Sequence, residues 1–390
     1  MRLVRLKLAA LGAAVALAAC GGGSGAGDQH PQVAFTSMVS FGDSLSDVGT
    51  YKVGTIAALG GGKWTVNGPT AKNWTELIAA DIMVAPPCAA ETGLLPNIPG
   101  LVGAAPVTNI PGCFNYAQGS SRVSGIFAPN SATLQAAPFN QVNLGLLAVP
   151  IATQMATHLT RVGGAYSGTE LVTVLGGGND FFMNFNGVAQ AAAGGAGAAG
   201  AAFIAGWSQS VQAAVSAGGA AAVGAASQAA VAGMGQAGAE LAGLVKTQIV
   251  AKGAKYVVVV NLPDVSQTPF ALALDAQTRT LMQTMVTTFN TQLAAGLNGA
   301  PVVLVDAYTQ GHDQNANPAQ YSLTNVTTPA CSATSPANPL QGSSIACTSA
   351  SLIAGDTSHY EFADTVHPTP YGYQLLAQFV AIQMAKAGWL

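Results

Sequence analysis

Four short apolar runs constrain most strongly how this chain of 390 residues can fold. They span residues 38–41, 171–175, 256–260 and 302–305, and Val is their most frequent residue. Runs of this length and β-branched content are typical of strands that are buried on both faces of a parallel sheet. Long stretches with the composition of helices, such as residues 278–297, lie between them. This alternation predicts an α/β fold in which helices cover both faces of the sheet.

A turn-prone group of residues follows each run. These groups are Gly42-Asp43-Ser44, residues 176–180, residues 261–264 and Asp306. In open α/β sheets, ligands bind at the carboxyl ends of the strands, where these groups lie. Their polar residues are therefore the first candidates for a functional site.

Charge is scarce along the chain, and its distribution limits the possible partners. Only 7% of the residues are charged, and three of the 13 basic residues lie within the first seven positions. The remainder therefore has a net negative charge and no basic patch to neutralise phosphates, so we expect no nucleic-acid partner. Residues 181–239 contain no charge and are rich in Ala and Gly. We interpret them as one or two Ala-rich helices packed across the sheet, with a membrane helix as the alternative.

The N-terminus has the features of an export signal. Residues 1–20 begin with basic residues and continue into an uncharged stretch that is too short to span a bilayer. The end of this segment, Leu17-Ala18-Ala19-Cys20, resembles the lipobox of bacterial lipoproteins, in which the Cys is lipidated. Residues 21–34 have the composition of a flexible linker, and residues 35–390 are expected to form a single domain.

We therefore expect an exported protein that is attached to a membrane through a lipid anchor on Cys20. Gly21 rather than Asp follows this Cys, which by analogy with lipoproteins favours the outer membrane. Secretion after cleavage of an ordinary signal peptide is the alternative.

The other four cysteines, Cys88, Cys113, Cys331 and Cys347, form an even set in the oxidising environment that export implies. Four cysteines allow three pairings, and we favour the sequence neighbours Cys88–Cys113 and Cys331–Cys347. The chain contains no CxxC or HExxH pattern, so we expect no metal site.

The segment Phe41-Gly42-Asp43-Ser44-Leu45-Ser46-Asp47 contains a candidate nucleophile, Ser44. A Ser directly after a strand, with Gly two residues before it, can lie on a sharp turn whose N–H groups face a carbonyl oxygen. Its hydroxyl would need a base, and the base would need an orienting group. The alternative is that the polar residues of this segment only cap a helix.

A candidate base and its orienting group lie near the C-terminus. In Asp364-Thr365-Val366-His367, the carboxylate can accept the Nδ1–H of the imidazole and leave Nε2 free for the Ser proton. Asp356 and His359 have the same spacing. We favour Asp364 and His367, because Pro-Thr-Pro and then an apolar helical pattern over residues 371–385 follow them, whereas His359 lies in a polar loop.

Taken in order, these segments resemble the conserved blocks of GDSL-type esterases and lipases of the SGNH hydrolase superfamily. FGDSLSD resembles block I and places the nucleophile on Ser44. Asn115-Tyr116-Ala117-Gln118-Gly119 resembles block II, whose Gly N–H serves the oxyanion hole, and this role maps onto Gly119. Block II usually continues with a second Gly, but Ser120-Ser121-Arg122 follow here.

The later blocks complete the resemblance. Asn179-Asp180 resembles the end of block III, which makes Asn179 an oxyanion donor beside the N–H of Ser44. DTVHPT resembles block V, with Asp364 and His367 as orienting group and base. The family has a flavodoxin-like three-layer α/β/α sandwich around a parallel sheet of about five strands, and the resemblance implies this fold here.

The function that the resemblance implies is ester hydrolysis through an acyl-enzyme, without a cofactor. A lipid or small-molecule ester is the expected substrate, of carboxylesterase, lipase or phospholipase type. The apolar segment 84–113 could line a cleft for an acyl chain or merely form a separate apolar cluster. The alternatives are an esterase acting on carbohydrate, aryl or polyester esters, and a non-catalytic surface binding protein that keeps the fold.

Overall fold

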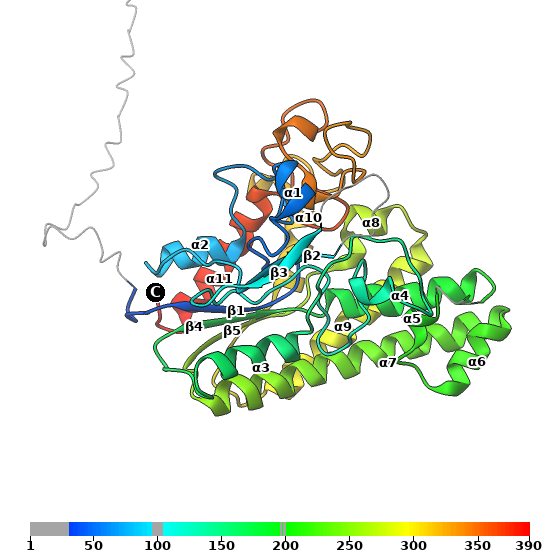
Figure 1. The fold of residues 1–390 in the computed structure, drawn as a ribbon, viewed down its shortest axis with the longest axis horizontal. Helices are drawn as coiled ribbons and strands as arrows, with labels where there is room; N and C mark the ends of the chain where they lie inside the picture. Colours follow the sequence, from blue (N-terminus) through cyan, green and yellow to red (C-terminus); the bar gives the residue numbers. More distant parts are fainter. Residues whose placement is uncertain (1–30, 96–103, 196, 198–199) are drawn as a thin grey trace, which may run out of the picture. The chain divides into compact units, whose positions relative to one another are not determined.

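Four parallel strands form the central sheet in the order β1-β4-β5-β6 (Figure 1). Their bounds are Met38–Gly42 (β1), Leu171–Leu175 (β4), Tyr256–Val260 (β5) and Val303–Val305 (β6). Every residue of β1 and β4 is buried, and so are all but the first residue of β5, as expected of strands covered on both faces. The computed structural model describes residues 31–95, 104–195, 197 and 200–390.

The sheet has four strands in the described residues, where about five were expected. The segment 114–118 runs along the free edge of β1 but pairs with it through a single bridge, between Ser40 and Asn115. The N–H of Ser40 donates to the carbonyl of Phe114 (3.0 Å), and the N–H of Tyr116 donates to the carbonyl of Ser40 (2.8 Å). The segment thus takes the place of a fifth strand and leads residues 119 and 120 toward the end of β1.

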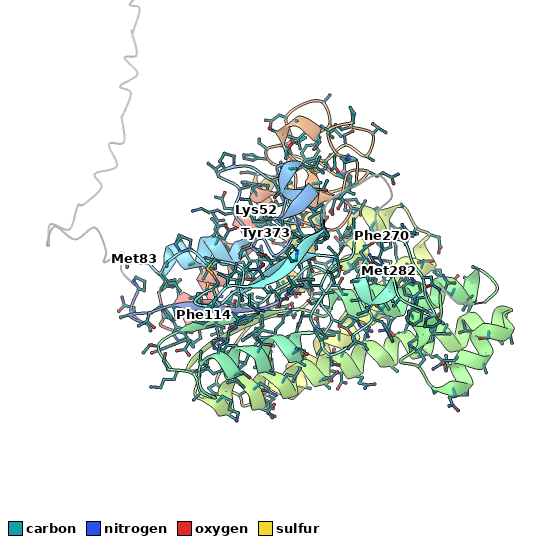
Figure 2. The ribbon with its side chains drawn as sticks, viewed as in Figure 1. Lys52, Met83, Phe114, Phe270, Met282 and Tyr373 are labelled. Atoms are coloured by element: carbon teal, nitrogen blue, oxygen red, sulfur yellow. A yellow bond between two sulfur atoms is a disulfide. The ribbon has the colours of Figure 1, made fainter. Side chains whose placement is uncertain are left out.

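Helices cover both faces of the sheet, so the predicted three-layer α/β/α arrangement is confirmed (Figure 1). On one face lie α2 (Trp74–Asp81) and α11 (Pro370–Lys386). On the other lie α3 (Ile151–Arg161), α4 (Gly178–Ala192), α7 (Ala220–Leu244) and α9 (Ala276–Leu297). Successive side chains of a strand point to opposite faces, so β1, β4 and β5 each contribute to two apolar clusters. Tyr373 of α11 belongs to one cluster and Met282 of α9 to the other (Figure 2).

Shorter elements complete the described chain. The helices are α1 (Gly54–Ala58), α5 (Ala201–Ile204), α6 (Gln209–Ala217), α8 (Pro269–Leu272) and α10 (Ala307–Ala316). Strands β2 (Glu91–Leu94) and β3 (Ala105–Asn109) form a separate antiparallel pair. The disulfide Cys88–Cys113 encloses this pair, and a second disulfide joins Cys331 to Cys347. Both bonds connect the sequence neighbours that we favoured.

The charge-free segment 181–239 folds into most of α4, the short helices α5 and α6, and most of α7. Among the residues that the structure describes, no helix has the length and hydropathy needed to cross a membrane. The small residues instead allow close packing of α7 against α9. A Cβ atom added to Gly238 of α7 would lie only 2.3 Å from the carbonyl oxygen of Phe289 in α9. The Gly at this position lets the two helix backbones approach each other.

The expected signal peptide, the lipobox with Cys20 and most of the linker fall within residues 1–30, outside the described residues. Export, the lipid anchor and the outer-membrane location therefore stay predictions.

We expect Gly238→Ala to destabilise the protein by about 1–3 kcal/mol, because the added methyl group overlaps the backbone of α9. Gly243→Ala in the same helix is the matched control, since an added Cβ there meets nothing within 4 Å. It should stabilise by up to about 1 kcal/mol through helix propensity. Urea unfolding measures both changes, and similar stability in the two variants would contradict the close approach at Gly238.

Candidate active site

Ser44 lies at the carboxyl end of β1, on a turn that is fixed from two sides. A Cβ atom at Gly42 would lie 2.2 Å from the carbonyl oxygen of Leu175 at the end of β4, so only Gly fits there. The side-chain amide of Gln154 in α3 accepts from the N–H of Gly42 and donates to its carbonyl, both at 2.9 Å. These contacts hold the Ser44 side chain at the edge of the sheet where the polar turn groups meet.

His367 connects Ser44 to Asp364. Its Nε2 lies 2.9 Å from the Oγ of Ser44, and its Nδ1 lies 2.8 and 2.9 Å from the two carboxylate oxygens of Asp364. A carboxylate only accepts hydrogen bonds, so Nδ1 carries the hydrogen and Nε2 is left to accept the Ser44 O–H. The structure thus brings together three residues that are expected to act as nucleophile, base and orienting group.

The carboxylate of Asp364 is buried, and its surroundings favour the charged form. Burial by itself would raise the pKa of Asp364. The positive charge that His367 can carry, together with the hydrogen bonds from His367, Ser344 and Val366, outweighs burial and holds this pKa well below its usual value. Asp364 therefore stays ionised and can stabilise a positive imidazole.

The competing pair, Asp356 and His359, is occupied elsewhere. The Nδ1 of His359 lies 2.8 Å from the carbonyl oxygen of Ser322, and its ring stacks on Tyr371 with centroids 4.2 Å apart. Asp356 accepts the N–H of Ser358 in its own turn. Neither residue contacts Ser44, so the geometry favours the pair that the sequence context favoured.

Gly119 does not fit the role of oxyanion donor that its place in block II implied. Its N–H donates to Oδ2 of Asp47 at 3.0 Å and is therefore already used. The next residue, Ser120, has φ of +71° and lines the cavity that contains Ser44. Within the described part of the chain, no acceptor is bound to the N–H of Ser120 or of Ser44. Ser120 thus has a free N–H and lines the same cavity as Ser44, whereas the N–H of Gly119 is bound to Asp47.

Asn179 lies in the first turn of α4 and also lines the cavity. Its Nδ2 donates one hydrogen to the carbonyl of Ser121 at 2.9 Å, which fixes the amide and leaves its second hydrogen unused. The neighbouring Asp180 accepts from the N–H of Val123 and from Arg122, both at 2.9 Å. These bonds tie the start of α4 to the segment that carries Ser120.

A cavity of about 320 Å³ opens beside Ser44. Most of its lining side chains are apolar, and they come from the ends of β4 and β5, from α4 and α11, and from the loop around His367. The apolar members are Leu45, Trp64, Pro129, Leu175, Phe182, Leu262, Pro263, Val265, Ala307, Phe362, Val366, Pro368 and Leu376. An apolar group such as an acyl chain can therefore lie next to the nucleophile.

Of the two roles considered for segment 84–113, its described residues fit the apolar cluster and not the acyl-chain cleft. None of the described residues of segment 84–113 lines the cavity, and residues 96–103, which include Ile98, Leu101 and Val102, are outside the described residues. Leu94 belongs instead to an apolar cluster with Tyr51 and Leu146, which also contains the cavity residue Trp64. The lining residues Leu262, Pro263 and Val265 come just after β5, in or next to the turn group 261–264. That group was predicted to lie near the site, but no sequence pattern predicted that its apolar residues would line the cavity.

Trp64 is the main site residue that the sequence analysis missed. It is 7% exposed, lines the cavity and faces the imidazole of His367, with ring centroids 4.8 Å apart and planes inclined by 33°. No pattern in the surrounding polar sequence distinguishes this Trp from a core residue.

Two further carboxyl groups near the site are buried. Burial raises the pKa of Asp43, next to the nucleophile, to about 7. Burial also raises the pKa of Glu361 to about 8, and its Oε2 has no hydrogen-bond partner among the described residues. In the part of the chain that the structure describes, no group of three His, Cys, Asp or Glu side chains could hold a metal ion.

Comparison with known proteins identifies related sequences and structures. The model of the family described as GDSL-like Lipase/Acylhydrolase matches residues 38–380, a range that contains Ser44, Asn179, Asp364 and His367. The crystal structure of the lipase Lip_vut3 from a goat rumen metagenome matches with 12% sequence identity and a TM-score of 0.37. That match covers 89% of this chain and 97% of the lipase chain. No curated protein matches the sequence.

We expect the free energy of unfolding of the Glu361→Gln variant to fall less than that of the wild type as the pH rises. The folded protein holds a proton on Glu361 up to about pH 8, whereas the unfolded chain releases it near 4.5. The contribution of protonated Glu361 to the free energy of unfolding is therefore fully present below about pH 4.5. It is lost as the pH rises through about 8.

Urea unfolding across this pH range measures the difference, which should reach about 5 kcal/mol in favour of the Gln variant at the alkaline end. Parallel pH dependences in the two proteins would show that Glu361 ionises freely in the folded state.

Proposed function

The chain belongs to the family of GDSL-like lipases and acylhydrolases and is a hydrolase that acts on ester bonds, and on this premise we propose that Ser44, His367 and Asp364 form its catalytic triad. The observation that carries the proposal is the unbroken set of contacts from Ser44 Oγ through both ring nitrogens of His367 to the carboxylate of Asp364. Ser44 also lines an apolar cavity, where an ester can reach it.

In the proposed reaction, Ser44 Oγ attacks the ester carbonyl carbon while Nε2 of His367 takes the hydroxyl proton. Asp364 stabilises the resulting imidazolium through Nδ1. When the tetrahedral intermediate collapses, the ester C–O bond breaks, and His367 gives its proton to the departing alcohol. Water then attacks the acyl-enzyme by the same steps, which release the acid and restore Ser44. No cofactor takes part in these steps.

We propose that the oxyanion hole consists of the N–H groups of Ser44 and Ser120 and the side-chain amide of Asn179. Ser120 takes the place that family resemblance gave to Gly119, because the Gly119 N–H is bound to Asp47. The left-handed backbone at Ser120 supports this assignment, since strained residues of this kind are concentrated at functional sites. Each such donor typically contributes about 10²–10³ in rate.

The cavity supports a substrate with an acyl chain of moderate length. Its volume is about 320 Å³, and a water-sized group occupies about 30 Å³, so it holds about ten non-hydrogen atoms. We propose carboxylic esters of medium-chain acids, from a lipid or a smaller alcohol, as the substrates. The apolar lining gives no corresponding support to a carbohydrate substrate, although Trp64 and Phe182 do place aromatic rings there.

Ser44→Ala should abolish hydrolysis of p-nitrophenyl esters and leave the fold intact, because the variant lacks the attacking oxygen. With the wild type, turnover of a series from acetate to palmitate should peak at medium-chain esters and fall for palmitate. Near-normal turnover by the Ala variant would refute Ser44 as the nucleophile. A profile that peaks at palmitate would refute the proposed chain length only.

The two Asp–His pairs provide the matched control for this assay. Asp364→Asn and His367→Ala should each reduce kcat by several orders of magnitude, since His367 takes the Ser44 proton and Asp364 orients and stabilises His367. Asp356→Asn and His359→Ala remove residues of the same types and spacing that have other partners, and they should stay close to the wild type. The reverse ranking would show that Asp356 and His359 are the catalytic pair and would contradict the proposed assignment.

A further inference from the structure

We propose that Trp64 is a positioning residue of this active site, whose indole face stabilises the positive charge that forms on His367 during the reaction. The indole ring lies 4.8 Å from the imidazole, centroid to centroid, with an angle of 33° between the planes. The two rings are thus in contact at a tilt, with the imidazole within reach of the indole π-system. The inference rests on the proposed function, because it requires His367 to become an imidazolium.

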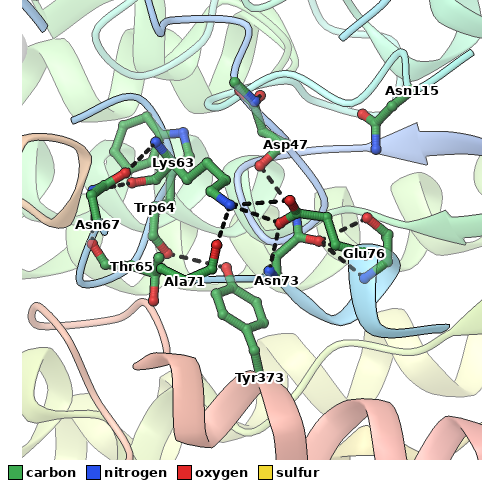
Figure 3. Close-up of polar contacts among 12 residues, drawn as sticks. Asp47, Lys63, Trp64, Thr65, Asn67, Ala71, Asn73, Glu76, Asn115 and Tyr373 are labelled. Carbon is green, nitrogen blue, oxygen red and sulfur yellow. Dashed lines mark hydrogen bonds and ion pairs between the residues drawn. The ribbon is translucent and has the colours of Figure 1, made fainter. Parts of the chain in front are cut away.

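The chain holds Trp64 firmly in this place. Figure 3 shows the contacts of the surrounding loop, in which the carbonyl of Trp64 accepts from the hydroxyl of Tyr373 in α11 at 3.2 Å. The neighbouring Lys63 is paired with Glu76, whose carboxylate also caps the first turn of α2. The hydroxyl of Thr65 donates to the carbonyl of Pro368, directly after the base, at 3.0 Å. The loop is therefore anchored to both helices on this face of the sheet.

A second set of contacts ties this loop to the group that orients the base. The side-chain amide of Asn67 donates to the carbonyls of Ser344 and Cys347, at 2.9 and 3.1 Å. The N–H of Ser344 donates to the carboxylate of Asp364 at 2.9 Å. Trp64 and Asp364, which both contact His367, are thus held by the same connected segments.

The opposite edge of the indole packs against the segment before the proposed oxyanion donor. A Cβ atom at Gly119 would lie 2.4 Å from Nε1 of Trp64, so the Gly makes room for the ring. Nε1 is buried and has no hydrogen-bond partner among the described residues. Buried Trp N–H groups usually find an acceptor, so no hydrogen bond of the indole N–H fixes the ring here. Its position is set by packing, against the apolar cluster that contains Tyr51 and against the ring of His367.

The chemical consequence follows from the charge on the imidazole. The face of an aromatic ring carries partial negative charge and attracts a cation within about 6 Å of its centroid, most strongly for Trp. His367 is neutral before the Ser proton is transferred and positive in the transition state of both half-reactions. The interaction is therefore stronger in the transition state than in the ground state, which raises kcat rather than substrate affinity.

The test compares Trp64→Phe, which keeps a ring with a weaker face, with Trp64→Met, which keeps apolar bulk without a ring. We expect kcat for a p-nitrophenyl ester to fall about tenfold in the Met variant and less in the Phe variant, with KM within about twofold of the wild type. Trp389→Leu, at the C-terminus beside Tyr256, removes a Trp away from the cavity and should leave kcat unchanged. Thermal unfolding of each variant reports losses of packing separately.

A double-mutant cycle distinguishes this role from cavity shaping. In a His367→Gln background no imidazolium forms, so Trp64→Met should not lower the residual rate further. Equal kcat in the wild type and both Trp64 variants would overturn the inference, as would a loss that persists in the Gln background. If the Met variant does not fold, Trp64→Phe takes its place in the cycle. It should then lower kcat in the wild-type background but not in the His367→Gln background. A wild type that hydrolyses no ester would instead refute the proposed function.

Discussion

The active site depends on one buried negative charge, the carboxylate of Asp364. A charge in the protein interior is stable only when it is paired and hydrogen-bonded, and here three backbone N–H groups and the ring of His367 provide the partners. One of these N–H groups belongs to Ser344, which Asn67 binds in turn. The loop that carries Asp364 and His367 must therefore assemble together with the segment around Ser344 and with the loop of Trp64 and Asn67, which is far away in the sequence.

Other carboxyl groups around the site show how strongly the partners determine protonation. Burial raises the pKa of Asp47 to about 6 and that of Asp43 to about 7, even though both accept hydrogen bonds from nearby N–H groups. Asp364 is equally enclosed, but it faces His367, and its pKa moves in the opposite direction. The negative charge that stabilises a positive imidazole is therefore that of Asp364, at Nδ1 of His367. The indole of Trp64 contacts the same ring.

The features that could be predicted from the sequence are those with a strong local pattern. The Val-rich runs predicted the strands almost to the residue, because a strand buried on both faces must be continuously apolar. The spacing of Asp364 and His367 identified a pair that can bond within one turn. Gly119 was placed in the oxyanion hole by analogy, but the bond that occupies its N–H comes from Asp47, and no local pattern reveals a contact over that separation. Trp64 was missed for the same reason, since only the folded loops bring it to His367.

The most direct test of the central claim is to identify the serine that reacts with an electrophile. The active protein would be treated with a p-nitrophenyl phosphonate, which transfers its phosphonyl group to an activated serine and releases p-nitrophenol. Mass spectrometry of the digested protein would then locate the adduct. A single adduct on Ser44, lost in the His367→Gln variant, is the result that this account predicts. An adduct on Ser120 or any other serine, or labelling of Ser44 that does not need His367, would contradict it.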